Sequence, residues 1–501
     1  MTGDSTRRVV TKASLIEGQA RRLRQAATLL GAQYETPLSD PIDETIRSLT
    51  FMVDRIYSAR VDAEVWLLCT AMGGVFPSDR DVETTMAFRD ENAQDTFFDW
   101  FIAVSAIPAV WATTTALEMR FVSDRPVVDV SSCARYDRHT GIQRVERETL
   151  PLWDRDHKIE LVAWTDLSGT YRSLTERERA RVVDWKGAST DDTEDDASET
   201  EFIVPWNTTI VLPEVPDKRQ SSRLISIARY SGNRVTAIGY DVIPLTSPEL
   251  LPRATGSDFL DYLGMMKYTS AVAGISKSAT EEFHGFFEAA GGDVASRIIV
   301  DTCELPASVP AVELGVAPTE RDVPVVLCVG SHEPRKNHIA VLHSAERLWR
   351  EGIDFELWFF GGGGWGTDFD EQAEILRKRG RKVLLRKAVS DSVLWSAYRD
   401  ARFTVFPSLH EGFGLPAAES LSFGTPVITT DYGSTREIAE RGGSIMVNPR
   451  SDAEIHDAMQ LLLTDDETYS RLVAEATAMI PRTWDEYANE LWEKLVIHES
   501  R

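Results

Sequence analysis

The pattern of apolar and polar positions changes about a quarter of the way along the chain. Over roughly the first 120 residues, apolar side chains recur at helical spacing, as at Leu15, Ala20 and Leu23, and this spacing predicts amphipathic helices. From Pro126 onward, short apolar runs alternate with helical patterns. That order predicts a parallel sheet with crossover helices. The pattern therefore predicts a helical amino-terminal region followed by α/β structure.

The sequence does not show what the apolar face of the helical region packs against. An apolar helix face must be buried, and this one can pack on the rest of the chain, mediate self-association or dock another protein. The uncharged run from Phe101 to Leu117 is a candidate membrane segment, but it contains Pro108 and barely reaches the length of a spanning helix. We expect a buried helical hairpin there.

The first expected strand, Val127 to Val130, is followed by a loop that opens an amphipathic helix. This loop carries Arg138, His139, Thr140 and Gly141, and Arg144 follows in the helix. Open α/β sheets bind ligands at the carboxyl ends of their strands, so these side chains are candidates for ligand contact. A simple tight turn at Thr140 and Gly141 is the alternative.

Asp241 follows a later apolar run in the same half of the chain. Its place at the end of an expected strand makes it a second candidate at the ligand-binding edge. An ordinary loop aspartate is the alternative.

A pair of cations follows the expected strand Val325 to Val329. Gly330 ends that strand, and Arg335 and Lys336 precede an apolar-periodic helix. Arginine can bind phosphate through two hydrogen bonds, and lysine adds a point charge. This junction suits a diphosphate, whereas a solvated basic turn is the alternative.

A strand, a glycine-rich loop and a helix follow one another from Phe403 to Gly424. Phe403 to Phe406 predicts a buried strand, and Pro416 suits the first position of a helix that Gly424 ends. Between them, Gly412 and Gly414 permit close approach of the backbone to a ligand. The helix start adds unpaired N–H groups, so the loop predicts a site for anions and hydroxyl groups.

Two carboxylates flank this loop. Glu411 lies in it, and Glu419 is expected in the first turn of the helix. A carboxylate accepts hydrogen bonds from a vicinal diol, so both are candidates for sugar recognition. Alternatively, Glu411 is a solvated loop residue and Glu419 stabilises the helix dipole.

The sequence Pro-Ser-x-x-Glu-Gly-Phe-Gly-Leu-Pro-x-x-Glu-x-x-x-x-Gly-Thr-Pro-Val from Pro407 to Val427 resembles the signature of retaining glycosyltransferases of family 4. The resemblance implies an α/β fold class with GT-B architecture, in which two Rossmann-like parallel-sheet domains face a cleft. We expect a helical extension at 1–120, an acceptor-side domain at 121–316, a nucleotide-sugar domain at 317–482, and a helix at 483–501 that returns to the first domain.

The resemblance also implies roles for the motif residues. Arg335 and Lys336 would stabilise the departing diphosphate, and Glu411 would hold the donor sugar; these three are the catalytic candidates. In the family's mechanism the leaving phosphate helps to deprotonate the acceptor, so neither a protein nucleophile nor a cofactor is expected. The expected donor-binding residues are Gly141, Gly330, Arg335, Lys336, Glu411, Gly412, Phe413, Gly414, Leu415 and Glu419.

The acceptor-side candidates are Arg138, His139, Thr140, Arg144 and Asp241. Their loop resembles the Thr-Gly-Ile-x-Arg-Val loop of family members that build bacterial surface polysaccharides with mannose or rhamnose donors. The resemblance implies a nucleotide-sugar donor and a glycan or lipid-linked glycan acceptor. Three other functions stay open: a partner-dependent or scaffold subunit of a glycosylation assembly, a nucleotide-sugar epimerase of the same architecture, and a phosphorylase-type enzyme of related architecture. The last would carry a lysine-bound pyridoxal phosphate, to which no sequence feature points.

Composition narrows these expectations. The 501 residues carry a formal net charge of −25, which argues against a nucleic-acid partner. The four cysteines are widely scattered, so neither a zinc site nor a disulfide framework is expected. Asp-x-Asp triplets arise readily in so acidic a chain, and we expect no metal. Without a recognisable secretory signal, we expect a cytoplasmic protein, with peripheral contact at the inner face of the membrane if the acceptor is lipid-linked.

Overall fold

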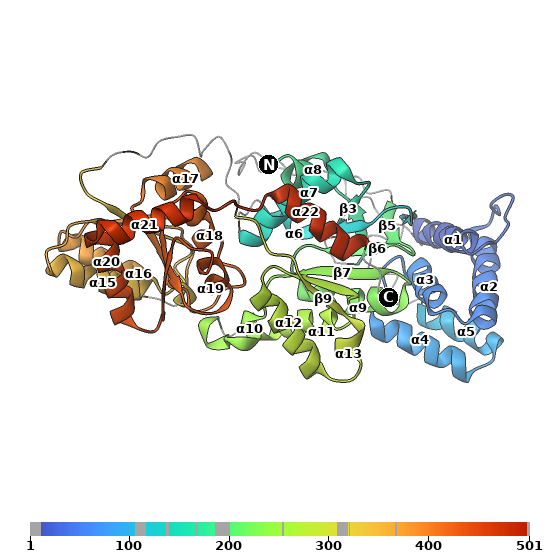
Figure 1. Ribbon diagram of the computed structural model, residues 1–501. Coiled ribbons are helices and arrows are strands. Elements are labelled where there is room, and N and C mark those ends of the chain that lie inside the picture. Colours follow the sequence, from blue (N-terminus) through green and yellow to red (C-terminus); the bar gives the residue numbers. More distant parts are fainter. Residues whose placement is uncertain are drawn as a thin grey trace.

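The computed structural model describes residues 12–105, 117–136, 140–165, 169–185, 201–252, 255–307, 319, 321–365, 368–387 and 389–497. Two α/β domains lie side by side in Figure 1, and a group of helices extends from the far end of the first domain. This arrangement has the expected α/β fold class, with two sheets and a mostly helical amino-terminal region.

The amino-terminal helices pack partly against the first sheet. Phe76 follows the third of them, and its ring lies 5.8 Å from that of Trp164 and 5.5 Å from that of Tyr171, both in strands of the sheet. The helix bounds are α1 (Lys12–Leu29), α2 (Pro41–Ala59), α3 (Asp62–Gly73), α4 (Asp79–Glu91) and α5 (Gln94–Ser105). Part of the expected apolar face is therefore buried against the α/β structure.

Only the first part of the uncharged run from Phe101 to Leu117 lies in a described helix, α5. Phe101 lies in that helix, while 106–116 lie outside the described residues, so the expected hairpin is not described. Among the described residues, no helix combines the length and the apolar character needed to cross a membrane.

The first sheet has nine strands in the order β1-β5-β4-β3-β2-β6-β7-β8-β9. All neighbouring strands are parallel except where β4 pairs antiparallel with β3 and β5. The bounds are β1 (Glu118–Val122), β2 (Val127–Asp129), β3 (Glu160–Trp164), β4 (Tyr171–Ser173), β5 (Glu201–Pro205), β6 (Thr209–Leu212), β7 (Arg234–Gly239), β8 (Ala271–Gly274) and β9 (Ile299–Thr302).

One expectation for this sheet is wrong. The first strand is β1 and not the run from Val127, because Glu118–Val122 pairs in parallel with β5 along its whole length. The strand buries Met119 and Val122. The last described helix before this strand, α5, ends at Ser105.

Helices cover this sheet, and its chain order reverses direction between β2 and β6. Such a switch point is where open α/β sheets form a crevice at their carboxyl edge. The helix bounds are α6 (Ser131–Arg135), α7 (Gly141–Asp156), α8 (Glu176–Val183), α9 (Ser221–Tyr230), α10 (Ile243–Thr246), α11 (Thr255–Met266), α12 (Lys277–Ala290) and α13 (Val294–Arg297).

The second sheet has six parallel strands in the order β12-β11-β10-β13-β14-β15. The strands are β10 (Val325–Val329), β11 (Glu356–Phe360), β12 (Val383–Arg386), β13 (Phe403–Phe406), β14 (Val427–Thr430) and β15 (Ser444–Val447). The helices are α15 (His338–Arg350), α16 (Phe369–Lys378), α17 (Asp391–Asp400), α18 (Leu415–Ser422), α19 (Gly433–Ala439), α20 (Asp452–Thr464) and α21 (Asp466–Thr477).

The chain then returns to the first domain through α22 (Trp484–Trp492) and a π-helical turn (Glu493–Ile497). The rings of Trp492 and Trp153 of α7 lie 5.3 Å apart. The indole N–H of Trp153 donates to the carbonyl oxygen of Ala488 at 2.9 Å. The last helix is therefore part of the first domain's packing (Figure 1).

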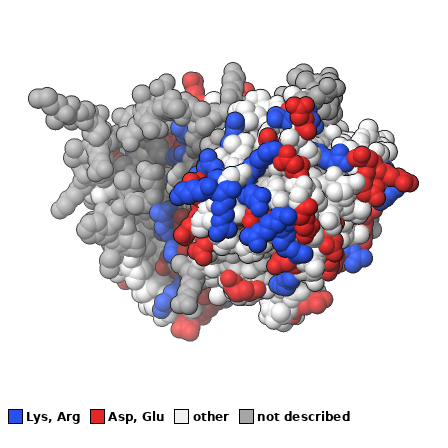
Figure 2. Space-filling model, turned by 90° about the vertical axis from the view of Figure 1, so that its left-hand side faces the viewer, with Lys and Arg blue, Asp and Glu red and all other residues white. Residues whose placement is uncertain are grey.

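Basic side chains gather at the outer end of the second domain, the end that Figure 2 turns toward the reader. The exposed basic residues of the second domain include Arg347 of α15, Lys378 at the end of α16, Arg379 directly after it, and Arg386 at the end of β12. The patch shows that a net charge of −25 does not describe every face of the molecule.

Candidate functional site

Three charged side chains from two loops of the second domain form one cluster. The guanidinium of Arg335 and the ammonium of Lys336 belong to a short 3₁₀ turn (Pro334–Lys336) after β10, and Glu411 follows β13. Glu411 Oε2 lies 2.7 Å from Arg335 Nη1, and Glu411 Oε1 lies 2.6 Å from Lys336 Nζ. The structure thus brings together the three residues that the sequence proposed as catalytic.

This charged cluster is buried, and its members set one another's charge. Burial alone would raise the pKa of the Glu411 carboxyl, but Lys336 and Arg335 outweigh it and lower the pKa to about 2. Burial and the neighbouring Arg335 lower the pKa of Lys336, although Glu411 acts in the opposite direction. Glu411 is therefore an anion at neutral pH, able to accept hydrogen bonds but not to deliver a proton.

The glycine loop touches the first domain. A side-chain carbon on Gly412 would lie 2.4 Å from the carbonyl oxygen of Tyr240 and 3.2 Å from the Cβ of Asp241. The carbonyl oxygen of Gly412 also accepts a hydrogen bond from Ser276 Oγ at 2.7 Å. Because only glycine permits this approach, the loop places the charged cluster beside the carboxyl end of β7, where Asp241 is half-buried and desolvation raises the pKa of its carboxyl.

Two further glycines of the predicted donor-binding set adopt positive φ angles. Gly414 adopts φ of 112°, in the region that favours glycine, and directly precedes α18. Gly330 has φ of 144°, and the side chain of Lys336 passes about 3.5 Å from where its Cβ would be. Of the other loop residues, Phe413 is buried and Leu415 is half-buried.

Glu419 corrects one expectation. Because α18 begins at Leu415, Glu419 lies in the second turn and not in the first, which contains no acidic residue. It is 4% exposed. Its carboxylate pairs with Arg144 of the first domain and accepts a hydrogen bond from the hydroxyl of Tyr398 at 2.8 Å.

The loop that precedes α7 explains how Arg144 reaches Glu419. Thr140 caps the helix through a reciprocal arrangement with Gln143. Gly141 is the first helical residue, and a Cβ there would lie 3.5 Å from the Leu415 side chain. The structure therefore sets Gly141 and Arg144 against α18, and Thr140 caps α7 as an exposed residue, whereas Arg138 and His139 lie outside the described residues.

Sequence reasoning missed a second contact between the domains. His410 Nε2 lies 2.7 Å from Glu282 Oε1, and His410 Nδ1 lies 2.9 Å from Ser247 Oγ. The hydrogen bond to Glu282 raises the pKa of His410 against the effect of burial. The position of His410 next to Glu411 was a signal for His410 itself, but nothing in the sequence marks Glu282 or Ser247.

The described residues contain no group of three or more His, Cys, Asp or Glu side chains placed to hold a metal ion. The chemical groups that the site does contain are the half-buried guanidinium of Arg335, the buried ammonium of Lys336, one carboxylate that accepts hydrogen bonds, and a glycine loop at a helix start.

Comparison with known sequences places this site in a family. Residues 316–479 match the sequence model of "Glycosyl transferases group 1". The serotype-specific mannosyltransferase WbdA of Escherichia coli is 27% identical over 333 residues, which cover 63% of this chain and 38% of that protein. The D-inositol 3-phosphate glycosyltransferase of Nocardia farcinica is 29% identical over 197 residues, 36% of this chain and 43% of that protein. The matches thus span less than half the length of either relative.

Solved structures share the fold. Sucrose-phosphate synthase from Thermosynechococcus elongatus superposes with a TM-score of 0.53 at 13% identity, covering 74% of this chain and 98% of that chain. Anabaena HepE, solved in complex with UDP and glucose, superposes with a TM-score of 0.52 at 11% identity, covering 74% and 99%. Residues 316–479, which form most of the second domain and contain the charged cluster, therefore belong to the glycosyl transferases group 1 family, and the two-domain arrangement as a whole has the fold of these solved structures.

Proposed function

We propose that this protein is a retaining glycosyltransferase that moves a mannosyl group from a nucleotide diphosphate sugar to a hydroxyl group of a glycan. The observation that carries the proposal is the buried cluster of Arg335, Lys336 and Glu411 beneath the glycine loop. In transfer, the bond from the sugar C1 to the diphosphate breaks and a bond from C1 to the acceptor oxygen forms. The acceptor proton passes to the leaving phosphate.

The cluster suits the charge that develops in this reaction. The leaving diphosphate gains negative charge, and preorganised cations in a site that excludes water stabilise such charge most strongly. Arg335 and Lys336 supply them, with the N–H groups at the start of α18. Glu411 then accepts hydrogen bonds from hydroxyls of the donor sugar, and Glu419 accepts from those of the ribose.

The first domain supplies the acceptor side. Asp241 lies beside the glycine loop, Arg144 pairs with Glu419 of α18, and Thr140 caps the helix that carries Arg144. Arg144 pairs with Glu419, so binding of the ribose by Glu419 requires Arg144 to release that carboxylate. Arg144 is then free to pair with the donor diphosphate or with the acceptor.

The relatives favour mannose over rhamnose as the donor sugar, because WbdA and the O-antigen chain mannosyltransferase B of Escherichia coli are both named as mannosyltransferases. The acceptor in this proposal is a glycan or lipid-linked glycan of a bacterial surface polysaccharide. Reaction takes place in the cytoplasm without a metal, and the basic patch of the second domain suits peripheral contact with an anionic membrane.

Thermal unfolding with a panel of nucleoside diphosphates and nucleotide-hexoses tests the proposal. A ligand at about a hundred times its dissociation constant stabilises the fold by roughly 2.7 kcal/mol. We expect one base series to stabilise the wild type and the effect to vanish in Arg335→Ala. The control Arg347→Ala removes an exposed arginine of α15 and keeps the effect.

If no nucleotide stabilises the wild type, the proposal fails and the scaffold alternative takes its place. The epimerase alternative predicts a different result. In that case the nucleotide-hexose is isomerised without an acceptor, and the nucleoside diphosphate is not released.

A further inference from the structure

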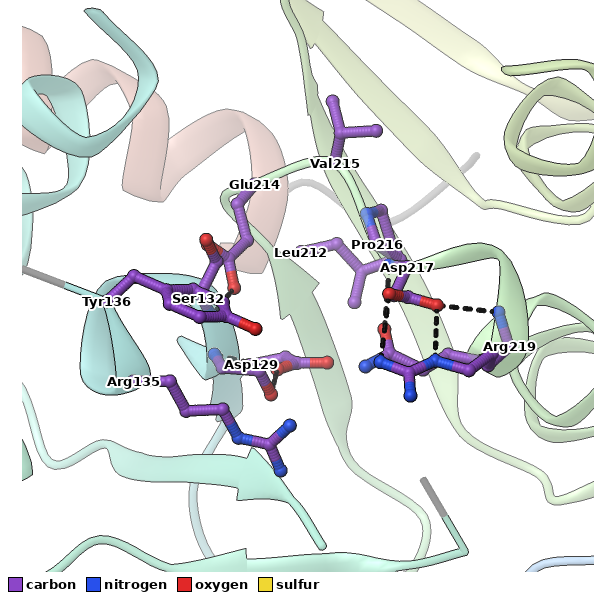
Figure 3. A pocket seen from close by; sticks show the side chains of 12 residues that line it. Asp129, Ser132, Arg135, Tyr136, Leu212, Glu214, Val215, Pro216, Asp217 and Arg219 are labelled. Carbon is purple, nitrogen blue, oxygen red and sulfur yellow. Dashed lines mark hydrogen bonds and ion pairs between the residues drawn. The ribbon is translucent and has the colours of Figure 1, made fainter. Parts of the chain in front are cut away.

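A cavity of about 190 Å³ lies in the first domain, at the carboxyl ends of β2 and β6. This is the switch point of the sheet, where ligand crevices form. Polar side chains surround it in Figure 3, among them Asp129, Ser132, Tyr136, Glu214, Asp217 and Arg219. None of them is among the residues predicted from the sequence.

Glu214 is part of the cavity wall, and one of its carboxyl oxygens has no hydrogen-bond partner among the described residues. The side chain is 8% exposed, and its Oε1 accepts from the backbone N–H of Ser132 at 2.5 Å. Its Oε2 is buried and has no hydrogen-bond partner among the described residues. Leaving such an atom unpaired is costly, so the cavity favours a ligand that hydrogen-bonds to Glu214.

The other charged groups of the wall already have partners. The carboxylate of Asp129 accepts from Ser131 Oγ at 2.6 Å and from Trp164 Nε1 at 2.7 Å. Asp217 pairs with Arg219 at 2.9 Å, and Arg135 donates to the carbonyl oxygen of Trp164. A phosphate would face the carboxylates, and an ammonium group would face the guanidinium groups of Arg135 and Arg219, so a ligand with uncharged hydroxyl groups fits best.

The charge state of Glu214 agrees with this reasoning. Burial, together with the charge of Asp129, raises the pKa of the Glu214 carboxyl to about 8. At neutral pH the group therefore holds a proton and can both donate a hydrogen bond and accept one. A sugar hydroxyl offers the same pair of capacities.

The size and position of the cavity indicate which sugar it takes. Pockets for drug-sized ligands measure about 300 to 1,000 Å³, so this cavity has room for a single ring. The hydroxyl of Tyr240 donates to the carbonyl oxygen of Pro213 at 2.6 Å and so joins the end of β7 to the end of β6. Glu214 therefore lies one strand away from Asp241, at the same edge of the sheet that faces the glycine loop.

We propose that this cavity binds one uncharged sugar ring, a residue of the acceptor glycan, and that Glu214 recognises its hydroxyl groups. Ring binding stands on the cavity alone, whereas its assignment to the acceptor rests on the proposed function. Tyr136 adds a partly exposed aromatic face to the wall.

Saturation-transfer NMR of the full chain tests ring binding. The probes are methyl α-D-mannopyranoside, D-glucosamine and D-glucuronate, which have the same ring size and differ in charge. We expect binding of the uncharged glycoside and weaker binding of both charged sugars. Loss of one hydrogen bond in Glu214→Ala should raise the dissociation constant about tenfold, and Glu214→Gln, which keeps a donor and an acceptor, should largely restore it.

Two further variants keep the test decisive. Tyr136→Ala changes a half-exposed part of the wall and should also weaken binding, even if Glu214→Ala unfolds. Glu288→Ala removes an exposed glutamate of α12 and should leave binding unchanged. The proposal is overturned if wild-type protein that binds nucleotide gives no signal with the glycoside, if Glu214→Ala and Tyr136→Ala bind like wild type, or if a charged sugar binds best. Failure of nucleotide binding in the wild type would instead remove the proposed function.

Discussion

At the scale of single residues, the cluster of Arg335, Lys336 and Glu411 shows how burial and charge work together. Each charge alone would be costly inside the protein, and the ion pairs offset that cost. A donor diphosphate would compete with Glu411 for the same two cations. The affinity for the nucleotide should therefore depend on both of them.

Replacing Lys336 by methionine should weaken the binding of nucleoside diphosphates. The substitution removes a buried cation and keeps most of the side-chain volume, and hydrogen bonds to charged groups contribute about 1.5–3 kcal/mol. We expect a dissociation constant raised by roughly 10- to 100-fold, measured by isothermal titration. Lys378→Met on the exposed face of α16 serves as the control. Equal affinities for the two variants would contradict the assigned role of Lys336.

Glu214 gives the protein a defined dependence of stability on pH. Its pKa is about 8 in the folded state against an ordinary value of 4.5, so the folded state retains a proton that the unfolded state loses. The contribution of this group to stability is therefore full below pH 4.5 and declines as the pH rises toward 8. The pKa values of Asp129 and Glu146 nearby are raised in the same direction.

Urea unfolding at pH 5 and pH 8 measures this effect. Glu214→Gln should lose less stability than the wild type between these two values, because the variant has no proton to release at this position. An identical loss in both proteins would show that Glu214 titrates normally.

The sequence identified residues that lie close together in a motif and missed those joined only by folding. Glu411, Arg335 and Lys336 stand out because each follows a recognisable strand in a loop of unusual composition. Glu214 and Tyr398 carry no such signal, because their partners Ser132 and Glu419 are fixed by strand order and helix packing. The hydrogen-bond partners of these two residues can therefore be identified only from the folded structure.

At the scale of elements, the unit of strand, loop and helix around the glycine loop was predictable. The strand Phe403–Phe406 is confirmed, and α18 begins one residue before the expected Pro416. By contrast, β1 was not predicted, because its five residues gain their pairing from β5, which lies far along the chain. Local patterns specify such short strands weakly.

Gly412→Ala should disturb the contact between the two domains. The new methyl group would lie 2.4 Å from the carbonyl oxygen of Tyr240, so the loop or β7 must move. We expect a lower unfolding temperature and loss of nucleotide-dependent stabilisation. The matched control is Gly285→Ala within α12, where the added carbon has no neighbour within 4 Å and alanine should stabilise the helix by about 0.5–1 kcal/mol. Equal unfolding temperatures for the two variants would contradict the close approach.

At the scale of the whole molecule, the last helix ties the end of the chain to the first domain. Trp492 stacks on His157 with ring centres 3.7 Å apart and packs against Trp153. This contact joins the helix that follows the second domain to α7 of the first domain. It should therefore make the unfolding of the two domains interdependent. Its loss should therefore affect the first domain most.

Trp492→Ala should cost about 3–5 kcal/mol, the usual range for a buried tryptophan. Ile480→Ala changes a side chain that is 95% exposed and should have an effect within about 0.5 kcal/mol. Urea unfolding, followed by tryptophan fluorescence, compares the two. A small effect of Trp492→Ala would show that the first domain is stable without the returning helix.

The central claim is that the charged cluster binds a nucleotide-sugar and releases its diphosphate to an acceptor. The most direct measurement incubates the protein with nucleotide-hexoses, including GDP-mannose, and with a mannose-terminated oligosaccharide, and follows diphosphate and product by NMR. We expect equal amounts of diphosphate and extended glycan, an α-linked product from an α-linked donor, and loss of both in Lys336→Met. A folded wild type that releases no diphosphate from any donor, or that gives an inverted product, would contradict the proposed role of the cluster.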